Sequence, residues 1–442
     1  MTGPEEGTPT RGRLARTARL AALPAAYAGR TALGLGKRLG GRPAELVALQ
    51  VQQRTAEQLF ATLGHLKGGA MKMGQVLSAM EAALPEQLAG PYRETLVRLQ
   101  EAAPPMPVAR MHAQLAASLG PDWRTRFRDF DDRPAAAASI GQVHRATWSD
   151  GTPIAVKVQY PGAAQALVAD LGVLQGLSPL VRAAAPHLDV RDLFTQLRDH
   201  FLEEVDYLCE ADAQTAFADA YRDDPDILVP EVLAVQGEVL VTRWIDGTPQ
   251  ARVISDGTQQ ERDRCGELLV RLFASGPVRA HRLHGDPHPG NFRLMDDGRL
   301  GVLDFGSTQA MPDGWPVRLG PLLAAGRDGD AVTLHRIAAA AGIVQPHEVT
   351  PAALVDLLAP YLQPLRTERF AFSRSWLQAL TRRASDPLSA ASRTQRRLAI
   401  PTRHLLLQRV AAELVGVLCS LGATVAVDGE LGRWLPGYPA AP

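Results

Sequence analysis

Apolar residues in the first quarter of the chain recur in alternating steps of four and three from Leu59 to Leu84. This spacing places them on one face of helical structure. Pro104, Pro105 and Pro107 then remove backbone donors and restrict the residues before them, which ends helices. We therefore expect a helical extension over residues 45–104 and a new domain from residue 105.

Beyond this boundary the pattern changes to short apolar runs separated by turn residues, which is typical of a sheet. Ile154–Val158 is such a run, and it follows the turn Ser149-Asp150-Gly151. A further run, Val239–Thr242, leads into a second turn-rich stretch. After one helix near 108–118, these runs predict a small mixed α/β lobe over residues 105–245.

Helical periodicity dominates most of the remaining chain. It extends from about residue 190 to residue 221, and it returns after residue 261. The apolar stretch 410–427 contains Glu413 and is too broken by polar residues to span a membrane, so we expect a buried helix there. The pattern predicts a larger helical lobe over residues 246–442, and hence an α+β architecture with two lobes.

Two acidic motifs of the second lobe carry candidate chemistry. Kinase catalytic loops have the spacing Asp-x-x-x-x-Asn, in which the acid orients the attacking group and the Asn holds a metal. Asp286 and Asn291 have this spacing, and Asp304 begins an Asp-Phe-Gly sequence after a short apolar strand, 300–303. The first motif alone could be a plain turn, but a hairpin with its turn at 296–298 joins it to the second. We predict Asp286 as the catalytic acid, and Asn291 and Asp304 as magnesium ligands.

A lysine on a buried strand indicates a phosphate site. In kinases the third strand ends in Val-Ala-Ile-Lys, whose lysine holds the nucleotide phosphates. Lys157 ends a similar run, and a buried lysine without a partner would be costly. An alanine-rich hairpin precedes it where kinases have a glycine-rich one, and should be stiffer. The candidate nucleotide-binding residues of this hairpin are Ala136, Ala137, Ala138, Ser139, Ile140, Gly141, Gln142 and Val143.

An acidic stretch in the next helical region offers partners for that lysine. A kinase needs a glutamate there, although an acidic helix face is usually only solvated. Asp206 and Glu210 share a helical face, whereas Glu204 and Asp206 point apart on a regular helix. Either one of these acids is structural or the helix is irregular.

Taken in order along the chain, these motifs resemble the UbiB/AarF/ADCK family of atypical kinases. The resemblance covers about residues 59–308 and rests on six motifs: Lys72-Met73-Gly74-Gln75, the alanine-rich loop through Val143, Ala155-Val156-Lys157-Val158-Gln159, Glu204-Val205-Asp206, Asp286 to Asn291, and Asp304-Phe305-Gly306. It implies a protein-kinase-like bilobal fold in which the N-terminal helical extension packs over the active site.

The resemblance also implies roles for residues that their own pattern leaves ambiguous. Lys72, by itself an ordinary surface lysine, would lie inside the site with Gln75, and their partners would be Glu204 and Asp206. Glu210 would pair with the strand lysine. The cofactors implied are ATP or ADP with Mg, and the family's alanine-rich loop disfavours ordinary kinase behaviour towards ATP.

Members of this family support isoprenoid quinone or other lipid metabolism and are thought to act as ATPases or small-molecule kinases at membranes. A lipid or quinone-precursor ligand is therefore implied as a partner, and a homo-oligomer is left open. This chain departs from the family in lacking C-terminal transmembrane helices and in its Thr242-Arg243 hinge. No Ala-Pro-Glu motif follows Asp304, so the peptide-docking platform of regular protein kinases is not visible.

Charge is unevenly distributed, although the formal net charge of the 442 residues is zero and favours no nucleic-acid partner. No acidic residue occurs between Gly7 and Ala44, and eight arginines and lysines lie there among leucines. This basic arm, residues 1–44, fits peripheral contact with an anionic membrane surface, a disordered soluble arm, or a transit peptide. Three widely spaced cysteines fit a reducing compartment, so we expect a cytoplasmic protein, with the inner membrane face as its place of contact.

Two alternatives to an ATP-hydrolysing atypical kinase stay open. Small-molecule phosphotransferases of the aminoglycoside or choline kinase type have catalytic loops much like His284–Asn291, but they have no Lys-x-Gly-Gln helix. A nucleotide-binding scaffold that does not turn over ATP is the other, and the complete set of catalytic residues argues against it.

Overall fold

The computed structural model describes residues 106–138, 140–163, 165, 205–345, 347–385, 389–395, 397–398 and 405–439. Four features proposed from the sequence lie outside these residues: the basic arm, the helical extension with Lys72 and Gln75, Ser139, and Glu204. Contacts along the chain divide it into two units, Met1–Pro104 with Gly162–Asp199, and Pro105–Pro161 with His200–Pro442. Nearly all described residues belong to the second unit.

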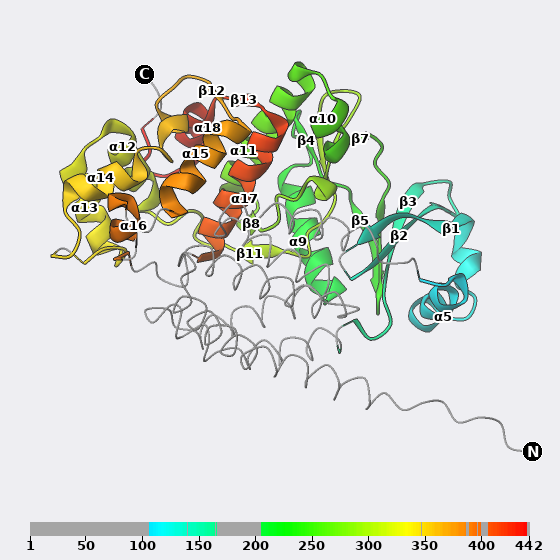
Figure 1. Ribbon diagram of the computed structural model, residues 1–442. Helices are drawn as coiled ribbons and strands as arrows, with labels where there is room; N and C mark the ends of the chain where they lie inside the picture. The colour runs from blue at the N-terminus through cyan, green and yellow to red at the C-terminus, as the bar shows by residue number, and fades with distance from the viewer. Residues whose placement is uncertain are drawn as a thin grey trace, which may run out of the picture. The chain divides into compact units, whose positions relative to one another are not determined.

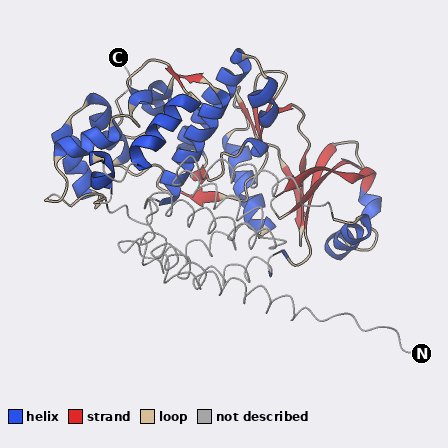
Figure 2. Ribbon diagram, in the orientation of Figure 1, coloured by secondary structure: helices blue, strands red, loops and turns tan. Residues whose placement is uncertain are grey.

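A five-stranded antiparallel sheet forms the N-terminal lobe of this unit, with the strand order β1-β2-β3-β6-β5 (Figure 2). Its strands are β1 (Phe127–Ala138), β2 (Gly141–Trp148), β3 (Pro153–Gln159), β5 (Val232–Gln236) and β6 (Val239–Arg243). Helix α5 (Val108–Leu119) begins after Pro107 and leads through a short 3-10 helix, η1 (Trp123–Arg126), into β1. Met111, Leu115 and Leu119 of α5 pack on one face of the sheet, because residues four apart share a helical face.

Helix α9 (Tyr207–Ala220) contacts both β5 and β6 of the sheet and α11 of the second lobe (Figure 1). It begins one residue after Asp206, whose carboxylate accepts a hydrogen bond from the backbone N–H of Leu208 and so caps the helix. The backbone of Asp206 is extended. The sequence left open whether one of these acids is structural or the helix irregular, and the structure shows Asp206 in a structural role, as the cap at which α9 begins.

The second lobe is mainly helical and is built around the long helix α11. Its helices are α10 (Gln250–Asp256), α11 (Gln259–Arg279), α12 (Leu319–Asp328), α13 (Ala331–Ala340), α14 (Pro351–Leu358), α15 (Arg374–Ser385), α16 (Ala390–Gln395), α17 (Leu405–Leu421) and α18 (Val427–Trp434), with 3-10 helices η2 (Pro289–Asn291) and η3 (Gln363–Leu365). Thr258 and Glu261 form a capping box at the start of α11.

The small lobe with its five-stranded sheet and the larger helical lobe together confirm the predicted α+β, protein-kinase-like fold with two lobes.

Short strands in this lobe carry the two acidic motifs. They are β4 (Ile227–Leu228), β7 (Thr248–Pro249), β8 (Arg282–His284), β9 (Phe292–Leu294), β10 (Leu300–Val302), β11 (Thr308–Ala310), β12 (Phe370–Ala371) and β13 (Thr424–Val425). β9 and β10 form the predicted hairpin, with Gly298 at a positive φ of 81° in its turn. β11 pairs with β8, which brings the strand before the catalytic loop beside the segment after Asp304.

The apolar stretch 410–427 forms a packed helix, as expected, but its end differs. α17 stops at Leu421 because Gly422 takes a positive φ of 62°, and β13 and α18 follow. None of the helices that could be described has the length and apolar character of a membrane span.

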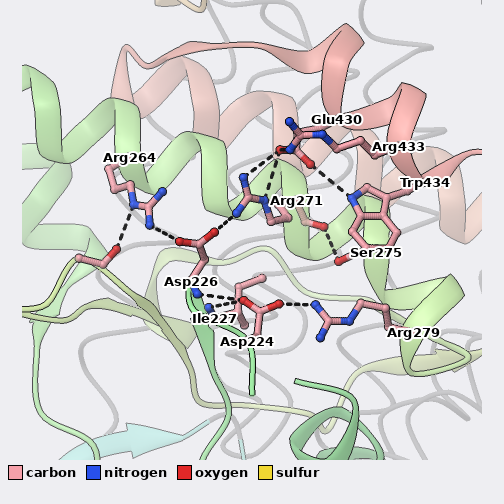
Figure 3. A network of polar contacts seen from close by, with 11 residues as sticks. Asp224, Asp226, Ile227, Arg264, Arg271, Ser275, Arg279, Glu430, Arg433 and Trp434 are labelled. Carbon is pink, nitrogen blue, oxygen red and sulfur yellow. Dashed lines mark hydrogen bonds and ion pairs between the residues drawn. The ribbon is translucent and has the colours of Figure 1, made fainter. Parts of the chain in front are cut away.

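A polar network secures the loop after α9 to the helical lobe (Figure 3). Asp226 pairs with Arg264, at 2.5 Å, and with Arg271, both of which lie on α11. Arg271 also reaches Glu430 of α18 at 3.1 Å. The network therefore fixes the chain segment that connects α9 with β4.

Candidate active site

Lys157 of β3 stands at the centre of a cluster of opposite charges. Its Nζ donates to both carboxylate oxygens of Glu210 on α9, at 2.6 and 2.9 Å, and lies 3.3 Å from Oδ2 of Asp304. Only 12% of the lysine side chain and 1% of the Glu210 side chain are exposed. The structure thus brings together three residues predicted from three separate motifs.

Burial and charge act against each other in this cluster. Burial lowers the pKa of Lys157, but the carboxylates of Asp304 and Glu210 outweigh that effect and raise it above its usual value. Burial raises the pKa of Glu210, and the ammonium of Lys157 opposes this rise. The lysine is therefore held as a cation, which is the state that binds phosphate.

The alanine-rich segment forms a strand and a tight hairpin turn. Ala136 and Ala137 are exposed on β1 and pair with Val143 and Gln142 of β2, while Ala138, which is buried, pairs with Gly141. A Cβ on Gly141 would stand 2.3 Å from the carbonyl oxygen of Val158, so this glycine permits close pairing of β2 with β3.

Side chains of the hairpin divide between the two faces of the sheet. Val143 is paired with Lys157 across β2 and β3, so the two share a face. Gln142 faces the other way: its Oε1 accepts from the backbone N–H of Met106 at 2.8 Å, and its amide lies 2.8 Å from the ring of His144. Gln142, which was proposed as a nucleotide-binding residue, therefore has its side chain on the face of the sheet that packs against α5, opposite to the face of Lys157. Ile140 is buried, with its carbonyl accepting from Tyr160.

The predicted catalytic loop is a compact turn between β8 and β9. The side-chain amide of Asn291 donates to the backbone carbonyl of Asp286 at 3.2 Å, and the carboxylate of Asp286 accepts from the backbone N–H of His288 at 3.2 Å. The two residues that the spacing singled out are thus in direct contact.

His284, to which sequence reasoning gave no role of its own, connects the two acidic motifs. Its Nε2 donates to the backbone carbonyl of Asp304 at 2.7 Å, and its Nδ1 lies 3.4 Å from the backbone N–H of Asp286. Burial lowers the pKa of this histidine, which keeps it neutral and fits one donating and one accepting nitrogen. Its position directly before Gly285-Asp286 is the signal that could have identified it.

Gln159 is a second residue without a predicted role. Its side-chain amide donates to the backbone carbonyl of Val205 at 2.9 Å, and 3% of the residue is exposed. The bond joins the end of β3 to the segment that caps α9, so it helps to place Glu210 opposite Lys157. Asp206, proposed as a site residue, acts in the described structure as that cap.

Asp304 is oriented by its own motif. Its Oδ1 accepts from the backbone N–H of Gly306 at 2.9 Å, and Phe305 is buried against Phe217 of α9, with ring centroids 5.1 Å apart. Packing of Phe305 beneath α9 therefore points the Asp304 carboxylate towards Lys157.

The oxygens of Asn291 and Asp304 suit magnesium, which binds hard oxygen ligands and is usually held by one or two carboxylates together with substrate phosphates. Over the described part of the chain, no group of three or more His, Cys, Asp and Glu side chains could hold a metal. These two residues would hold Mg only together with the phosphates of a nucleotide.

The linker between the lobes carries an aromatic residue flanked by two cations. Arg145 of β2 and Arg293 of β9 lie over the ring of Trp244, at 4.9 and 6.0 Å from its centroid. Arg293 also donates to the carbonyl of Gly247 at 2.9 Å. Trp244 therefore contacts a strand of each lobe.

This fold and this cluster define a protein-kinase-like domain. A family model described as the ABC1 atypical kinase-like domain matches residues 98–334, more than half of the chain. The chain therefore belongs to the ABC1 family of atypical kinase-like proteins, which confirms the resemblance to the UbiB/ADCK kinases.

Curated relatives include the mitochondrial atypical kinase coq-8 of Caenorhabditis elegans, 33% identical over 64% of this chain and 38% of that protein. The mitochondrial atypical kinase COQ8 of Schizosaccharomyces pombe is 28% identical over 72% of this chain and 52% of that protein. The chain thus spans about half the length of these relatives or less.

A solved structure resembles almost the whole chain. It is the complex of Rv3197 with erythromycin from Mycobacterium tuberculosis, with a TM-score of 0.69 and 41% sequence identity over 90% of this chain and all of that one.

Proposed function

We propose that this chain binds ATP or ADP with Mg and hydrolyses ATP as an atypical kinase. The observation that carries the proposal is the convergence of Lys157, Glu210 and Asp304 beside the Asp286 loop. Lysine, glutamate and metal-binding aspartate must all be in place for phosphoryl transfer in kinases.

Each residue has a defined task in this reaction. Lys157 holds phosphate oxygens and is itself positioned by Glu210. Asp286 orients the attacking water and accepts its proton; the bond between the γ-phosphorus and the bridging oxygen breaks, giving ADP and inorganic phosphate. Asn291 and Asp304 would hold Mg, which when bound would supply neutralisation of charge on the phosphates.

The biological setting that we propose is isoprenoid quinone or other lipid metabolism at a membrane surface. Two observations support this setting: curated relatives are named as COQ8 atypical kinases, and the family resemblance implies a role in lipid metabolism. Peripheral contact through the basic arm, residues 1–44, would bring the domain to anionic lipid.

Mg-dependent ATP hydrolysis, with and without anionic liposomes, tests the proposal. Asp304→Asn should abolish turnover, because the amide carries no charge for the metal. Asp297→Asn is the matched control: Asp297 lies in the turn of the adjoining hairpin and is 49% exposed. Hydrolysis by Asp304→Asn at the wild-type rate would contradict the metal role, and nucleotide binding without turnover by the wild type would favour the scaffold.

The erythromycin complex of Rv3197 favours a second candidate function, binding of a macrolide. Calorimetric titration of the full chain with erythromycin, in the presence and absence of ADP, tests it. Saturable binding would support macrolide recognition, and no heat at millimolar ligand would exclude it.

A further inference from the structure

The catalytic loop of this chain differs from that of protein kinases at the residue before the catalytic acid. Protein kinases carry arginine there, in His-Arg-Asp, whereas this chain has Gly285. The backbone N–H of Gly285 donates to the carbonyl of Ser307 at 2.6 Å, and a Cβ on Gly285 would stand 2.7 Å from that oxygen. No side chain fits at this position, because the loop lies directly against the segment after Asp304.

A cation reaches the loop from another part of the chain. Arg409 of α17 donates from Nη2 to the backbone carbonyl of Gly285 at 3.0 Å. The Gly285 residue is therefore held on both sides, through its N–H by Ser307 and through its C=O by Arg409. The next residue along the chain is Asp286, so these bonds fix the backbone from which the catalytic carboxylate extends.

Arg409 is itself oriented by a neighbour on the same helix. Its Nη1 lies 3.9 Å from Oε1 of Glu413, one helical turn further on, and the two side chains are 29% and 25% exposed. Asp286 is the other charged group of the described residues that acts on Glu413. The guanidinium of Arg409 thus lies near Glu413 through one nitrogen and donates to the catalytic loop through the other.

We infer that Arg409 is a positioning residue for the reaction, which holds the Asp286 loop through the Gly285 carbonyl, with Glu413 orienting its guanidinium. The inference rests on the proposed function, in which Asp286 orients the attacking water. It assigns to α17, more than one hundred residues after the catalytic loop, a part in catalysis that no kinase motif includes.

The test compares Arg409→Ala and Arg409→Lys in the full chain. Arg383→Ala is the matched control, since Arg383 of α15 also donates to a backbone carbonyl, that of Asp356 at 2.7 Å, outside the catalytic loop. Steady-state ATP hydrolysis gives kcat and KM, and hydrogen exchange followed by mass spectrometry reports on peptides covering residues 284–292.

Arg409→Ala should lower kcat by about 100-fold, the effect of roughly 1 Å of misplacement, and leave KM for ATP within about threefold. Arg409→Lys should recover most of the rate, because an ammonium can also donate to the carbonyl. Exchange should rise in residues 284–292 and stay unchanged elsewhere, and Arg383→Ala should behave as wild type.

Wild-type kcat together with wild-type exchange in Arg409→Ala would overturn the inference. So would faster exchange throughout the helical lobe, which would mean a general loss of stability. If the wild type does not hydrolyse ATP, the proposed function fails, and the exchange of residues 284–292 alone decides whether Arg409 holds the loop.

Discussion

Lys157 carries one positive charge and lies close to two carboxylates, those of Glu210 and Asp304. The two carboxylates differ in burial, and this difference separates their roles. Glu210 is almost fully buried and lies closest to the ammonium, so it serves the lysine, whereas 28% of the Asp304 side chain is exposed. The second carboxylate is thus left for a divalent cation, which would be the largest local charge there. In the function that we propose, the lysine and the two acids would form a phosphate site together with a bound metal.

Glu413 offers a test at the scale of one residue. Burial raises the pKa of Glu413 to about 7, Arg409 opposes the rise, and Asp286 adds to it. A raised pKa in the folded state means that Glu413 contributes stability below its unfolded value near 4.5, which is lost as the pH rises through about 7. Wild type should lose this stability between pH 5 and pH 8, whereas Glu413→Gln has no group at this position that titrates. The free energy of unfolding of the variant minus that of wild type should therefore rise by on the order of 2 kcal/mol from pH 5 to pH 8.

Urea-induced unfolding of both proteins at these two pH values measures the gain. Glu348→Gln is the control, since Glu348 is an exposed glutamate of the same lobe. An equal difference between wild type and Glu413→Gln at both pH values would refute the account of this carboxylate.

Single residues show where sequence reasoning succeeds and where it ends. Asp286, Asn291 and Asp304 could be predicted because their spacing within short motifs is local. Arg409 could not, because its hydrogen bond to Gly285 joins segments that only the folded chain brings together. His284 had a local signal in its position before Gly285-Asp286, but its hydrogen bond to Asp304 is seen only in the folded chain. The side-chain direction of Gln142 follows from strand alternation, but only once the register with β3 is known.

At the scale of elements, the β1–β2 hairpin is restrained on one side by β3. Gly141 pairs with Gln159, and the backbone of Val158 occupies the place where a side chain at Gly141 would lie. The hairpin is therefore anchored next to its turn, and Ala136, Ala137 and Ala138 pair with β2 as strand residues. This geometry fits the stiffness that alanine in place of glycine predicts.

Gly141→Ala should destabilise the fold by about 1–3 kcal/mol, because the added methyl group forces β2 away from β3. Gly416→Ala on α17 is the opposite control, since a Cβ there meets nothing within 4 Å. Gly416→Ala should raise the free energy of unfolding by up to about 1 kcal/mol, because alanine favours the helix more than glycine does. Thermal unfolding of the two variants measures both effects, and a Gly141→Ala protein as stable as wild type would contradict the close pairing.

Elements with a strong local pattern were predictable, notably β3, the β9–β10 hairpin and α5. The exact ends of helices were not predictable, because a single capping side chain or a glycine at positive φ determines where a helix begins or ends. α9 starts only at Tyr207 because Asp206 caps it, and α17 stops at Leu421 because Gly422 takes positive φ. β4 pairs in parallel with β10, a long-range contact that the order of residues along the chain does not reveal.

Within the described part of the second unit, the contacts between the sheet and the helical lobe include two that are made by cationic side chains. Lys157 meets Asp304 at one, and Arg145, Trp244 and Arg293 stack at the other. Cation–π contacts of this kind contribute roughly 0.5–1 kcal/mol each when exposed. The bilobal architecture was predictable from the ordered motifs, whereas these joints depend on side chains of both lobes.

Mg-dependent binding of ADP tests the central claim most directly, because it asks whether Lys157, Glu210 and Asp304 form a metal–phosphate site without requiring turnover. Calorimetric titration of the full chain with ADP would be run in Mg and in EDTA, for wild type, Asp304→Asn and the control Asp297→Asn. We expect Mg to tighten ADP binding at least about tenfold, or 1.4 kcal/mol, in wild type and Asp297→Asn, and to have no effect in Asp304→Asn. Equal Mg-dependent tightening in Asp304→Asn and wild type would show that the metal binds elsewhere and would contradict the assignment of this site.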